Sequence, residues 1–415
     1  MERFDVIVLG AGMVGIGTAV HLRDRGRHVA LVDRRGPAEE TSFGNAGLIQ
    51  SEAIMPYAFP RDPKVILGVI TGQRTDARVV WHALPATARW LLAYVGQSGP
   101  AAVHRTAIAN VPILARALPE HMRLMERAGA TDLLRSGGYI RVYREAREIE
   151  AALEVDEAVR REFGVPYEAW DGARLREEEP HIASTLAGAV HMPEPGRVID
   201  PSDTGKAYAA LFEREGGTFR IGEAASLARD GSLWRVETEA GPIAAPDVVV
   251  ALGPWSGDAL AREGVRVPLG VKRGYHRHYR PARQGVLNHL VLDPAVGYAL
   301  GTNKRGFRLT TGAEFDRRDA PPTPVQLARV EQRAREIFPL GEAIDEPWLG
   351  SRPCLPDLLP MIGPVPGKAG LWAHFGHHHL GFTLGPATGR LLAEMMTGET
   401  PYADPTPYRV DRFAA

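Results

Sequence analysis

The first 33 residues alternate between short apolar runs and one segment with helical spacing. Residues 4–9 (FDVIVL) form a short run rich in β-branched side chains, which predicts a buried parallel strand. From residue 13 the apolar positions recur at helical spacing until Gly26, and residues 28–33 (HVALVD) predict a second strand. The pattern therefore predicts a βαβ unit of about 30 residues.

The predicted secondary structure differs between segments of the remaining chain. Residues 60–180 are rich in Ala, Leu, Arg and Glu at helical spacing and predict a helical insertion. After Asp200 the α/β pattern returns, and the run PDVVVALGPWS at 246–256 predicts a buried strand that enters a loop. Residues 265–315 alternate like the strands of an antiparallel sheet. Near the C-terminus, Gly385 and Pro386 predict a helix start, and Gly398 predicts its end.

Composition narrows the class of partner. A length of 415 residues predicts roughly two or three compact units, and a net charge of −1 gives no basic field for nucleic acid or for an anionic membrane. Cys354 is the single cysteine, which excludes an internal disulfide framework and a Cys-x-x-Cys motif. No secretory signal precedes the first strand, and the apolar stretch 6–20 is shorter than the ~20 residues of a membrane span. We expect a cytoplasmic protein without a transmembrane segment, acting on a small molecule.

The motif GAGMVG lies where the first strand meets the first helix. Gly10 would allow the tight turn, Gly12 the approach of a pyrophosphate, and Gly15 the packing of helix on sheet. The helix N-terminus adds free N–H groups and partial positive charge. Asp33, at the end of the second strand, is spaced to accept hydrogen bonds from ribose hydroxyls. The turn residues expected to bind the cofactor are Gly10, Ala11, Gly12, Met13, Val14 and Gly15.

The identity of the dinucleotide stays open at this motif between NAD and FAD. Arg34 and Arg35 also permit NADP, because arginine commonly binds a 2′-phosphate. The next segment, ETSFGNAGLIQ at 40–50, is a run of small, hydrogen-bonding residues that permits close backbone approach to a large planar ligand and favours flavin. The further candidates for cofactor binding are Arg34, Thr41, Ser42, Asn45, Ala46, Gly47 and Leu48.

Three adjacent histidines in GHHHLGFTLGPATG, residues 376–389, raise the question of a metal site. Consecutive side chains point in different directions, so at most two of His377, His378 and His379 could meet one ion. His276 and His278 would share one face of a strand, but no Cys or acidic cluster accompanies them. We therefore predict no metal site, and one or two of these histidines could equally be surface residues.

Together these segments resemble the FAD-dependent D-amino-acid dehydrogenases, within the wider glycine oxidase and D-amino-acid oxidase superfamily. The resemblance spans nearly the whole chain in the family's order and is specific to the family, not to a substrate. The matching segments are GAGMVG, ETSFGNAGLIQ, VVVALGPWS, GSRPCLPDLLPMIGP at 350–364 and GHHHLGFTLGPATGRLLAEMMTG.

The resemblance implies an α/β fold in which a Rossmann-like FAD-binding domain is interleaved with an α+β substrate domain containing a mostly antiparallel sheet. We expect the FAD-binding domain to comprise 1–60, 183–256 and 346–415, and the substrate domain 61–182 and 257–345.

The implied reaction is oxidation of a D-amino acid, with hydride passing from Cα to flavin N5. An imino acid leaves and gives a 2-oxo acid and ammonia, or a cyclic imine. In the family, the arginine of G-x-R-P holds the substrate carboxylate; here it is Arg352. The late glycine-rich loop and the following helix N-terminus face the N1 and C2=O edge of the flavin, where a positive dipole end stabilises the reduced state. The corresponding cofactor candidates are Gly253, His379, Leu380, Gly381 and Thr383.

Three further residues are candidates for the substrate pocket. The family more often has a glycine where this chain has His378, so an imidazole that titrates near neutral pH could enter the pocket there. Tyr275 could close the pocket or bind the carboxylate, with an ordinary sheet tyrosine as the equal alternative. Tyr57, followed closely by Phe59, could line an apolar wall.

The sequence offers no obvious acidic residue to bind a cationic side chain of the substrate. D-proline or cis-4-hydroxy-D-proline is therefore favoured over D-arginine. A glycine- or sarcosine-type oxidase, a non-catalytic FAD-binding subunit and an NADP-binding reductase remain alternatives. For the electron acceptor, the resemblance favours quinone or the respiratory chain over oxygen, with a peripheral contact at the inner face of the membrane left open.

Overall fold

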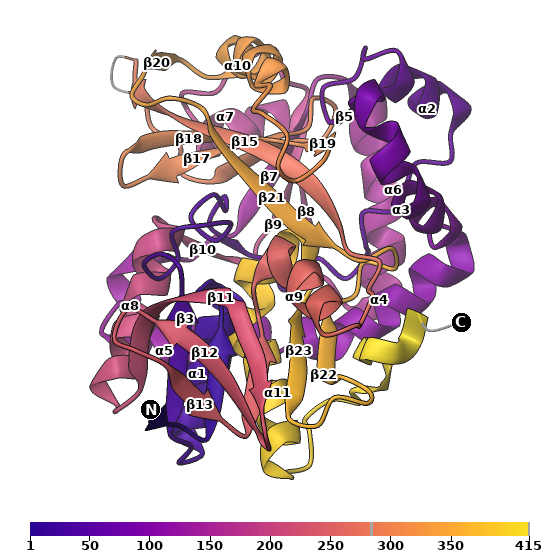
Figure 1. The fold of residues 1–415 in the computed structure, drawn as a ribbon. Coiled ribbons are helices and arrows are strands. Elements are labelled where there is room, and N and C mark those ends of the chain that lie inside the picture. Colours follow the sequence, from indigo (N-terminus) through magenta and orange to yellow (C-terminus); the bar gives the residue numbers. More distant parts are fainter. Residues whose placement is uncertain (283–284, 414–415) are drawn as a thin grey trace.

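Two large β-sheets dominate the protein (Figure 1). The computed structural model describes residues 1–282 and 285–413. In Figure 1 the nine-stranded sheet occupies the lower half and the eleven-stranded sheet the upper half. The predicted α/β class with a mostly antiparallel second sheet is confirmed.

The nine-stranded sheet has the order β1-β13-β12-β11-β3-β2-β14-β23-β22. Its central five strands, from β11 to β23, pair in parallel, and antiparallel strands flank them. Strands β2, β3 and β14 are rich in valine and almost entirely buried, as expected where helices cover the sheet, whereas β11 is mostly half-buried or exposed. The strands are β1 (Glu2–Arg3), β2 (Val6–Leu9), β3 (Val29–Asp33), β11 (Thr218–Asp230), β12 (Leu233–Thr238), β13 (Ile243–Ala245), β14 (Asp247–Val250), β22 (Met361–Pro364) and β23 (Leu371–Phe375).

The eleven-stranded sheet is antiparallel except for the pairs β16–β7 and β19–β5. The long strand β15 is its hub, because β18, β19, β20 and β21 all pair with it. The strands are β5 (Ala77–Val79), β7 (Tyr139–Tyr143), β8 (Glu168–Asp171), β9 (Gly188–Met192), β15 (Gly270–Pro281), β16 (Leu290–Asp293), β17 (Tyr298–Asn303), β18 (Gly306–Thr311), β19 (Ala313–Phe315), β20 (Leu340–Ala343) and β21 (Trp348–Cys354).

A three-stranded sheet and the helices complete the fold. The small sheet contains β4 (Leu48–Ile49), β10 (Gly196–Val198) and β6 (Leu134–Arg135). Within the described ranges, no helix combines the length and apolarity needed to cross a membrane. The helices are α1 (Met13–Asp24), α2 (Pro63–Ile70), α3 (Leu84–Gly96), α4 (Pro100–Leu114), α5 (Ala117–Ala128), α6 (Ala146–Phe163), α7 (Gly172–Glu178), α8 (Pro201–Arg214), α9 (Ser256–Arg262), α10 (Val325–Ile337) and α11 (Gly381–Thr397).

Two predicted elements differ from the structure. The segment 60–180 is not purely helical: it also supplies β7 and β8 to the eleven-stranded sheet, since local spacing does not reveal pairing with distant strands. The C-terminal helix α11 begins at Gly381, not at Gly385, and carries Pro386 inside it.

The predicted domain division stays a prediction, and two features bear on its boundaries. Strand β9, inside the range 183–256, pairs in the eleven-stranded sheet. Helices α4 and α5 pack against α11, so part of the range 61–182 shares a core with the first βαβ unit.

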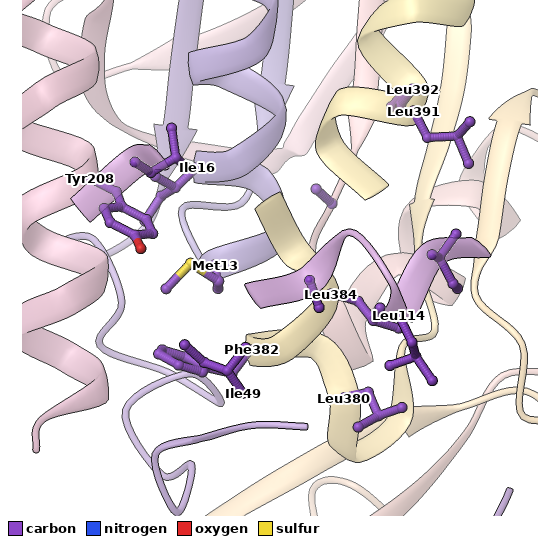
Figure 2. Packing of buried hydrophobic residues seen from close by; sticks show 14 of the residues in the cluster. Met13, Ile16, Ile49, Leu114, Tyr208, Leu380, Phe382, Leu384, Leu391 and Leu392 are labelled. Atoms are coloured by element: carbon purple, nitrogen blue, oxygen red, sulfur yellow. The ribbon is translucent and has the colours of Figure 1, made fainter. Parts of the chain in front are cut away.

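Helices α1 and α11 approach each other through glycines. A Cβ added to Gly17 would lie 2.6 Å from the carbonyl oxygen of Gly385, and one added to Gly389 would lie 2.6 Å from the Gly17 carbonyl carbon. Apolar side chains surround this contact, which joins the N-terminal and C-terminal segments of the chain. Figure 2 labels ten of these buried residues: Met13, Ile16, Ile49, Leu114, Tyr208, Leu380, Phe382, Leu384, Leu391 and Leu392.

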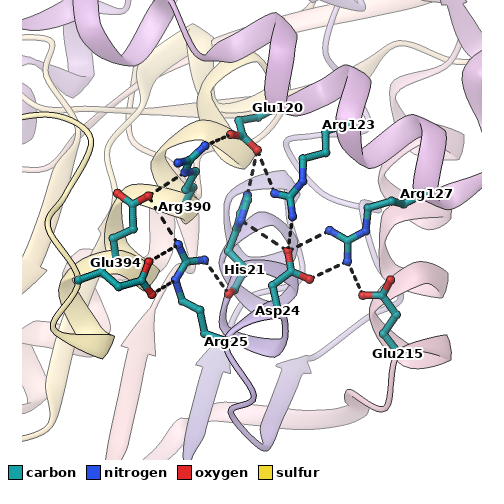
Figure 3. Close-up of polar contacts among 10 residues, drawn as sticks. His21, Asp24, Arg25, Glu120, Arg123, Arg127, Glu215, Arg390 and Glu394 are labelled. Carbon is teal, nitrogen blue, oxygen red and sulfur yellow. Dashed lines mark hydrogen bonds and ion pairs between the residues drawn. The ribbon is translucent and has the colours of Figure 1, made fainter.

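A network of paired charges joins α5, α8 and α11 to the C-terminal half of α1 (Figure 3). Asp24 accepts from Arg127 at 2.6 Å, and Glu120 accepts from Arg390 at 2.7 Å. His21 lies buried among them with neither ring nitrogen hydrogen-bonded to the described residues, and burial lowers its pKa to about 4. The network therefore connects these helices at a site remote from the N-terminus of α1.

Replacing Gly17 by alanine tests the helix contact. The added methyl would overlap the α11 backbone, so the Gly17→Ala variant is expected to lose about 1–3 kcal/mol of unfolding free energy, as overpacked sites do. Urea unfolding measures the change. The control is Gly96→Ala in α3, where a Cβ meets nothing within 4 Å and stability should stay equal or rise slightly. Equal stability of both variants would contradict the tight contact.

Candidate functional site

A cavity of about 940 Å³ is lined by residues from both large sheets. The N-terminal turns of α1 and α11 border it, together with the loop 40–50 and strands β15 and β21. Helix N-termini present free N–H groups and partial positive charge. The cavity is therefore suited to an anionic ligand that extends between the two sheets.

The backbone geometry of the GAGMVG turn requires glycine at two of its positions. Gly10 has φ +104°, and a Cβ there would lie 2.4 Å from the Ala251 carbonyl oxygen. A Cβ on Gly15 would lie 1.8 Å from the Gly10 carbonyl oxygen, so both positions exclude a side chain. Gly10 and Gly12 border the cavity, and at Gly12 the backbone can approach a ligand.

Asp33 sits at the end of β3 and borders the cavity. Its carboxylate accepts from Ala11 N–H at 2.7 Å and Arg35 N–H at 3.0 Å, and burial raises its pKa. The Arg34 guanidinium lies 4.2 Å from the Trp255 ring centroid and donates to Glu40 at 2.6 Å. Because Arg34 and Arg35 both lie within ion-pair distance of Glu40, neither is free for a 2′-phosphate, which weighs against the NADP alternative.

The loop 41–48 is fixed from both sides. Ser42 Oγ accepts from Met13 N–H at 3.0 Å, which attaches the loop to the start of α1. Arg308 donates to the carbonyls of Phe43 at 2.9 Å and Asn45 at 2.6 Å, which attaches it to β18. Sequence reasoning missed Arg308, because no local signal connects it with a loop more than 260 residues earlier.

The N-terminal turn of α11 borders the cavity because a distant histidine compensates for Pro386. Proline has no N–H, so the Phe382 carbonyl loses its helical donor. His121 Nε2 donates to this carbonyl at 2.9 Å, and His121 Nδ1 lies 3.0 Å from the Tyr208 hydroxyl. Burial lowers the pKa of His121 to about 4, which keeps the ring neutral. This contact explains why the helix begins at Gly381, four residues before the predicted start at Gly385.

Arg352 on β21 borders the cavity and is half-buried. Its guanidinium donates to the carbonyls of Thr311 at 3.0 Å and Gly312 at 2.9 Å, and it lies over Gly274, where a Cβ would come within 2.6 Å. No carboxylate of the described residues pairs with it, and burial lowers its pKa. The remaining N–H donors suit a carboxylate brought by a ligand.

Tyr275 borders the cavity, but its hydroxyl is already engaged by protein groups. Its hydroxyl donates to Glu314 at 3.1 Å and accepts from Thr323 N–H at 2.7 Å. Side chains alternate along β15, so Tyr275 shares a face with buried Arg273 while Lys272 and Gly274 share the face of Arg352. The Tyr275 hydroxyl is thus part of a polar network, and a contact of Tyr275 with the substrate stays a prediction.

The three histidines are buried or nearly so and border the cavity, which excludes the surface alternative. His378 has φ +43°, a conformation that favours glycine, and its Nδ1 lies 2.8 Å from Nδ1 of His379. Burial holds the pKa of His378 well below 6.5, so the expected titration near neutral pH is wrong. Burial likewise lowers the pKa of His377 and of His379 to about 3. Among the described residues, no group of three or more His, Cys, Asp or Glu side chains could hold a metal ion.

Tyr57 borders the cavity with its ring centroid 4.8 Å from that of His379. Lys272 on β15 and Tyr94 on α3 are among the bordering residues that were missed. A lysine within a predicted strand was the available signal for Lys272, whereas nothing in the sequence marks Tyr94.

Most of the predicted site residues border the cavity. Those that do are Gly10, Gly12, Met13, Val14, Asp33, Arg34, Thr41, Ser42, Asn45, Ala46, Leu48, Tyr57, Gly253, Tyr275, Arg352, His378, His379 and Gly381.

Ala11, Gly15, Gly47, Leu380 and Thr383 lie outside the cavity lining. The expected Leu380 N–H donor is not free, because it donates to the His377 carbonyl at 2.9 Å. The Thr383 hydroxyl donates to the Leu48 carbonyl at 3.2 Å. These two residues therefore support the cavity from behind.

Comparison with known proteins decides the family. A family model described as FAD dependent oxidoreductase (DAO) matches residues 5–395. The chain belongs to this family. It is 29% identical to a D-amino-acid oxidase of Bradyrhizobium diazoefficiens, over 99% of both chains. It is 30% identical to a D-amino acid dehydrogenase of Chromohalobacter salexigens, over 99% of this chain and 100% of that protein. Glycine oxidase from Geobacillus kaustophilus has a similar fold, with a TM-score of 0.77 at 23% identity over 99% of both chains.

FAD is therefore the cofactor of this DAO-family enzyme, and the residues present fit it. The N-terminus of α1 and the free approach at Gly12 suit the diphosphate, and Asp33 suits a ribose. The loop 41–48 and the N-terminus of α11 border the rest of the cavity, where a planar ring system would lie between the two sheets.

The neutral His121 gives a pH-dependent test of the α11 N-terminus. Its pKa is about 4 when folded and about 6.5 when unfolded, so the unfolded chain binds the extra proton as pH falls between these values. The free energy of unfolding should drop by about 2 kcal/mol from pH 8 to pH 5 through this residue.

The matched variant is His121→Gln, which keeps an N–H donor but cannot titrate. Urea unfolding of both proteins at pH 8, 6.5 and 5 should show a smaller acid-side loss in the variant. Equal losses in the two proteins would mean that His121 is not held neutral.

Proposed function

We propose that this enzyme oxidises the Cα–N bond of a D-amino acid. The observation that carries the proposal is Arg352, a half-buried guanidinium that has no carboxylate partner among the described residues and borders the cavity suited to FAD. A carboxylate can bind it through two parallel hydrogen bonds, which fixes the orientation of Cα. The relatives named as D-amino-acid enzymes support the choice of substrate class.

When bound, FAD would supply the two-electron acceptor for the hydride that leaves Cα. The substrate nitrogen loses a proton, and the product is an imino acid that hydrolyses to a 2-oxo acid and ammonia, or stays a cyclic imine. Arg352 holds the carboxylate throughout, and Tyr57 and His379 provide part of the pocket wall. His378 is not proposed as a group that titrates during turnover, because its pKa lies well below neutral.

Small apolar or cyclic substrates, such as D-proline or cis-4-hydroxy-D-proline, are our specific proposal. Two carboxylates that border the cavity near Gly297 are already paired: Asp76 with Arg74 at 2.7 Å and Asp293 with Arg144 at 2.6 Å. A cationic side chain would find no free partner in either of them. A glycine- or sarcosine-type substrate is the alternative within the same chemistry.

For the electron acceptor, we propose a quinone or another respiratory carrier rather than oxygen, at the cytoplasmic face of the membrane. Large apolar side chains are exposed on α2, on α3 and on the segment between them, as expected of a surface that touches lipid. They are Leu67, Ile70, Trp81, Leu92 and Val95. Turnover with a soluble quinone should exceed turnover with oxygen, and faster turnover with oxygen would contradict this part of the proposal.

The function is tested by anaerobic titration of the purified flavoprotein with single amino acids. Bleaching of the flavin absorbance by a narrow set of D-enantiomers, including D-proline or cis-4-hydroxy-D-proline, is the expected result. Bleaching by sarcosine and glycine instead would favour the alternative. A flavin that no amino acid reduces would overturn the proposal.

Arg352 gives the corresponding mutational test. Arg352→Met should lower kcat/KM for the best D-amino acid by at least about 100-fold, because it removes a charge-assisted bidentate contact worth several kcal/mol. Arg352→Lys, which keeps the charge but not the fork, should retain an intermediate rate. FAD content and the melting temperature control for folding. A kcat/KM within threefold of wild type in Arg352→Met would rule out the carboxylate role.

A further inference from the structure

Lys272, like Arg352, is a cation that borders the cavity without an ion pair to the described residues. In the antiparallel pair of β15 and β21, Lys272 lies directly opposite Arg352, so both side chains leave the same face of the sheet. Both residues border the cavity, and no carboxylate of the described residues lies within ion-pair distance of either. The proposed function uses only Arg352, which leaves Lys272 without a role.

Lys272 is held by an aromatic residue rather than by an acid. Its Nζ donates to the Tyr94 hydroxyl at 2.8 Å and lies 4.0 Å from the Tyr94 ring centroid. Tyr94 in turn donates to the Tyr57 carbonyl, so its single proton is used and its oxygen accepts from the lysine. An ammonium has three N–H donors, and only one is occupied by Tyr94.

An ammonium in this position is costly unless a ligand compensates it. Burial, with the neighbouring Arg352 charge, lowers the pKa of Lys272 to about 8, yet the side chain borders open space rather than apolar packing alone. A lysine that served only to pack on Tyr94 and Phe315 would not need to border the cavity. A hydrogen-bond acceptor on the bound substrate would satisfy the free donors.

We propose that Lys272, positioned by Tyr94, determines specificity by donating a hydrogen bond to an oxygen on the substrate side chain. This inference rests on the proposed function, in which Arg352 holds the α-carboxylate. Directly opposed residues in an antiparallel pair have Cβ atoms about 4.5–5.5 Å apart, so the two cations can address two groups of one small molecule. The oxygen can belong to a ring hydroxyl, as in cis-4-hydroxy-D-proline, or to a side-chain carboxylate, as in D-aspartate.

The test compares substrate pairs that differ in this oxygen, using the FAD-loaded enzyme. One pair is cis-4-hydroxy-D-proline and D-proline, and the other is D-aspartate and D-2-aminobutyrate. For each pair, the ratio of kcat/KM for the oxygen-bearing member over the plain member is measured in the wild type and in Lys272→Met. We expect the wild-type ratio to exceed one in at least one pair and to fall at least tenfold in the variant, while the plain member changes less than threefold.

The pair in which the ratio falls identifies the source of the oxygen. The inference would be overturned if Lys272→Met lost kcat/KM equally for both members of each pair, or if the ratio stayed unchanged in both pairs. Lys272→Arg, which keeps the cation and donors, should restore part of the ratio. If Lys272→Met fails to retain FAD, Lys272→Gln gives the same comparison with a smaller change in polarity. Bleaching of wild-type flavin by D-amino acids with no change of ratio would reject only this inference, whereas no bleaching at all would reject the proposed function.

Discussion

The close contact between α1 and α11 is the constraint on which the site depends. Only glycine at positions 17, 385 and 389 allows the two backbones to approach so closely. The contact places the N-terminal turns of two helices, more than 350 residues apart in the chain, at one cavity. Two partial positive charges then act on a single bound ligand. Within α11, the hydrogen bond from His121 to Phe382 offsets the donor missing at Pro386 and lets the helix extend to the cavity.

The eleven-stranded sheet adds full charges to these partial ones. Strand alternation on β15 and β21 sorts the polar residues into two groups. Arg273 and Tyr275 join buried Glu314 on one face, where Arg273 is paired with Glu314 and Asp316. Lys272 and Arg352 lie on the other face, bordering the cavity, without acids. A cavity bordered by uncompensated cations is matched to a ligand that brings its own negative charge, and an amino acid carboxylate does so.

Much of the cofactor site could be predicted because its signals are local. The turn at Gly10, the position of Asp33 and the small residues of the loop 41–48 follow from short-range backbone requirements that a sequence displays directly. The start of α11 could not be predicted, because the compensating donor His121 lies 261 residues away. The face of Tyr275 and the pairing of Lys272 with Arg352 depend on strand register, which local alternation does not specify. The titration expected of His378 failed for a related reason, since its burial comes from tertiary packing.

We expect FAD and the substrate to bind in the same cavity. A crystal structure of the FAD-loaded enzyme with 2-aminoisobutyrate tests this most directly. This amino acid has no hydrogen on Cα and cannot be oxidised by hydride loss, so it should remain bound. We expect its carboxylate on the Arg352 guanidinium with its amine and Cα turned toward the flavin ring, and the FAD ribose on Asp33. A carboxylate bound elsewhere, with Arg352 in contact with protein groups alone, would contradict this arrangement.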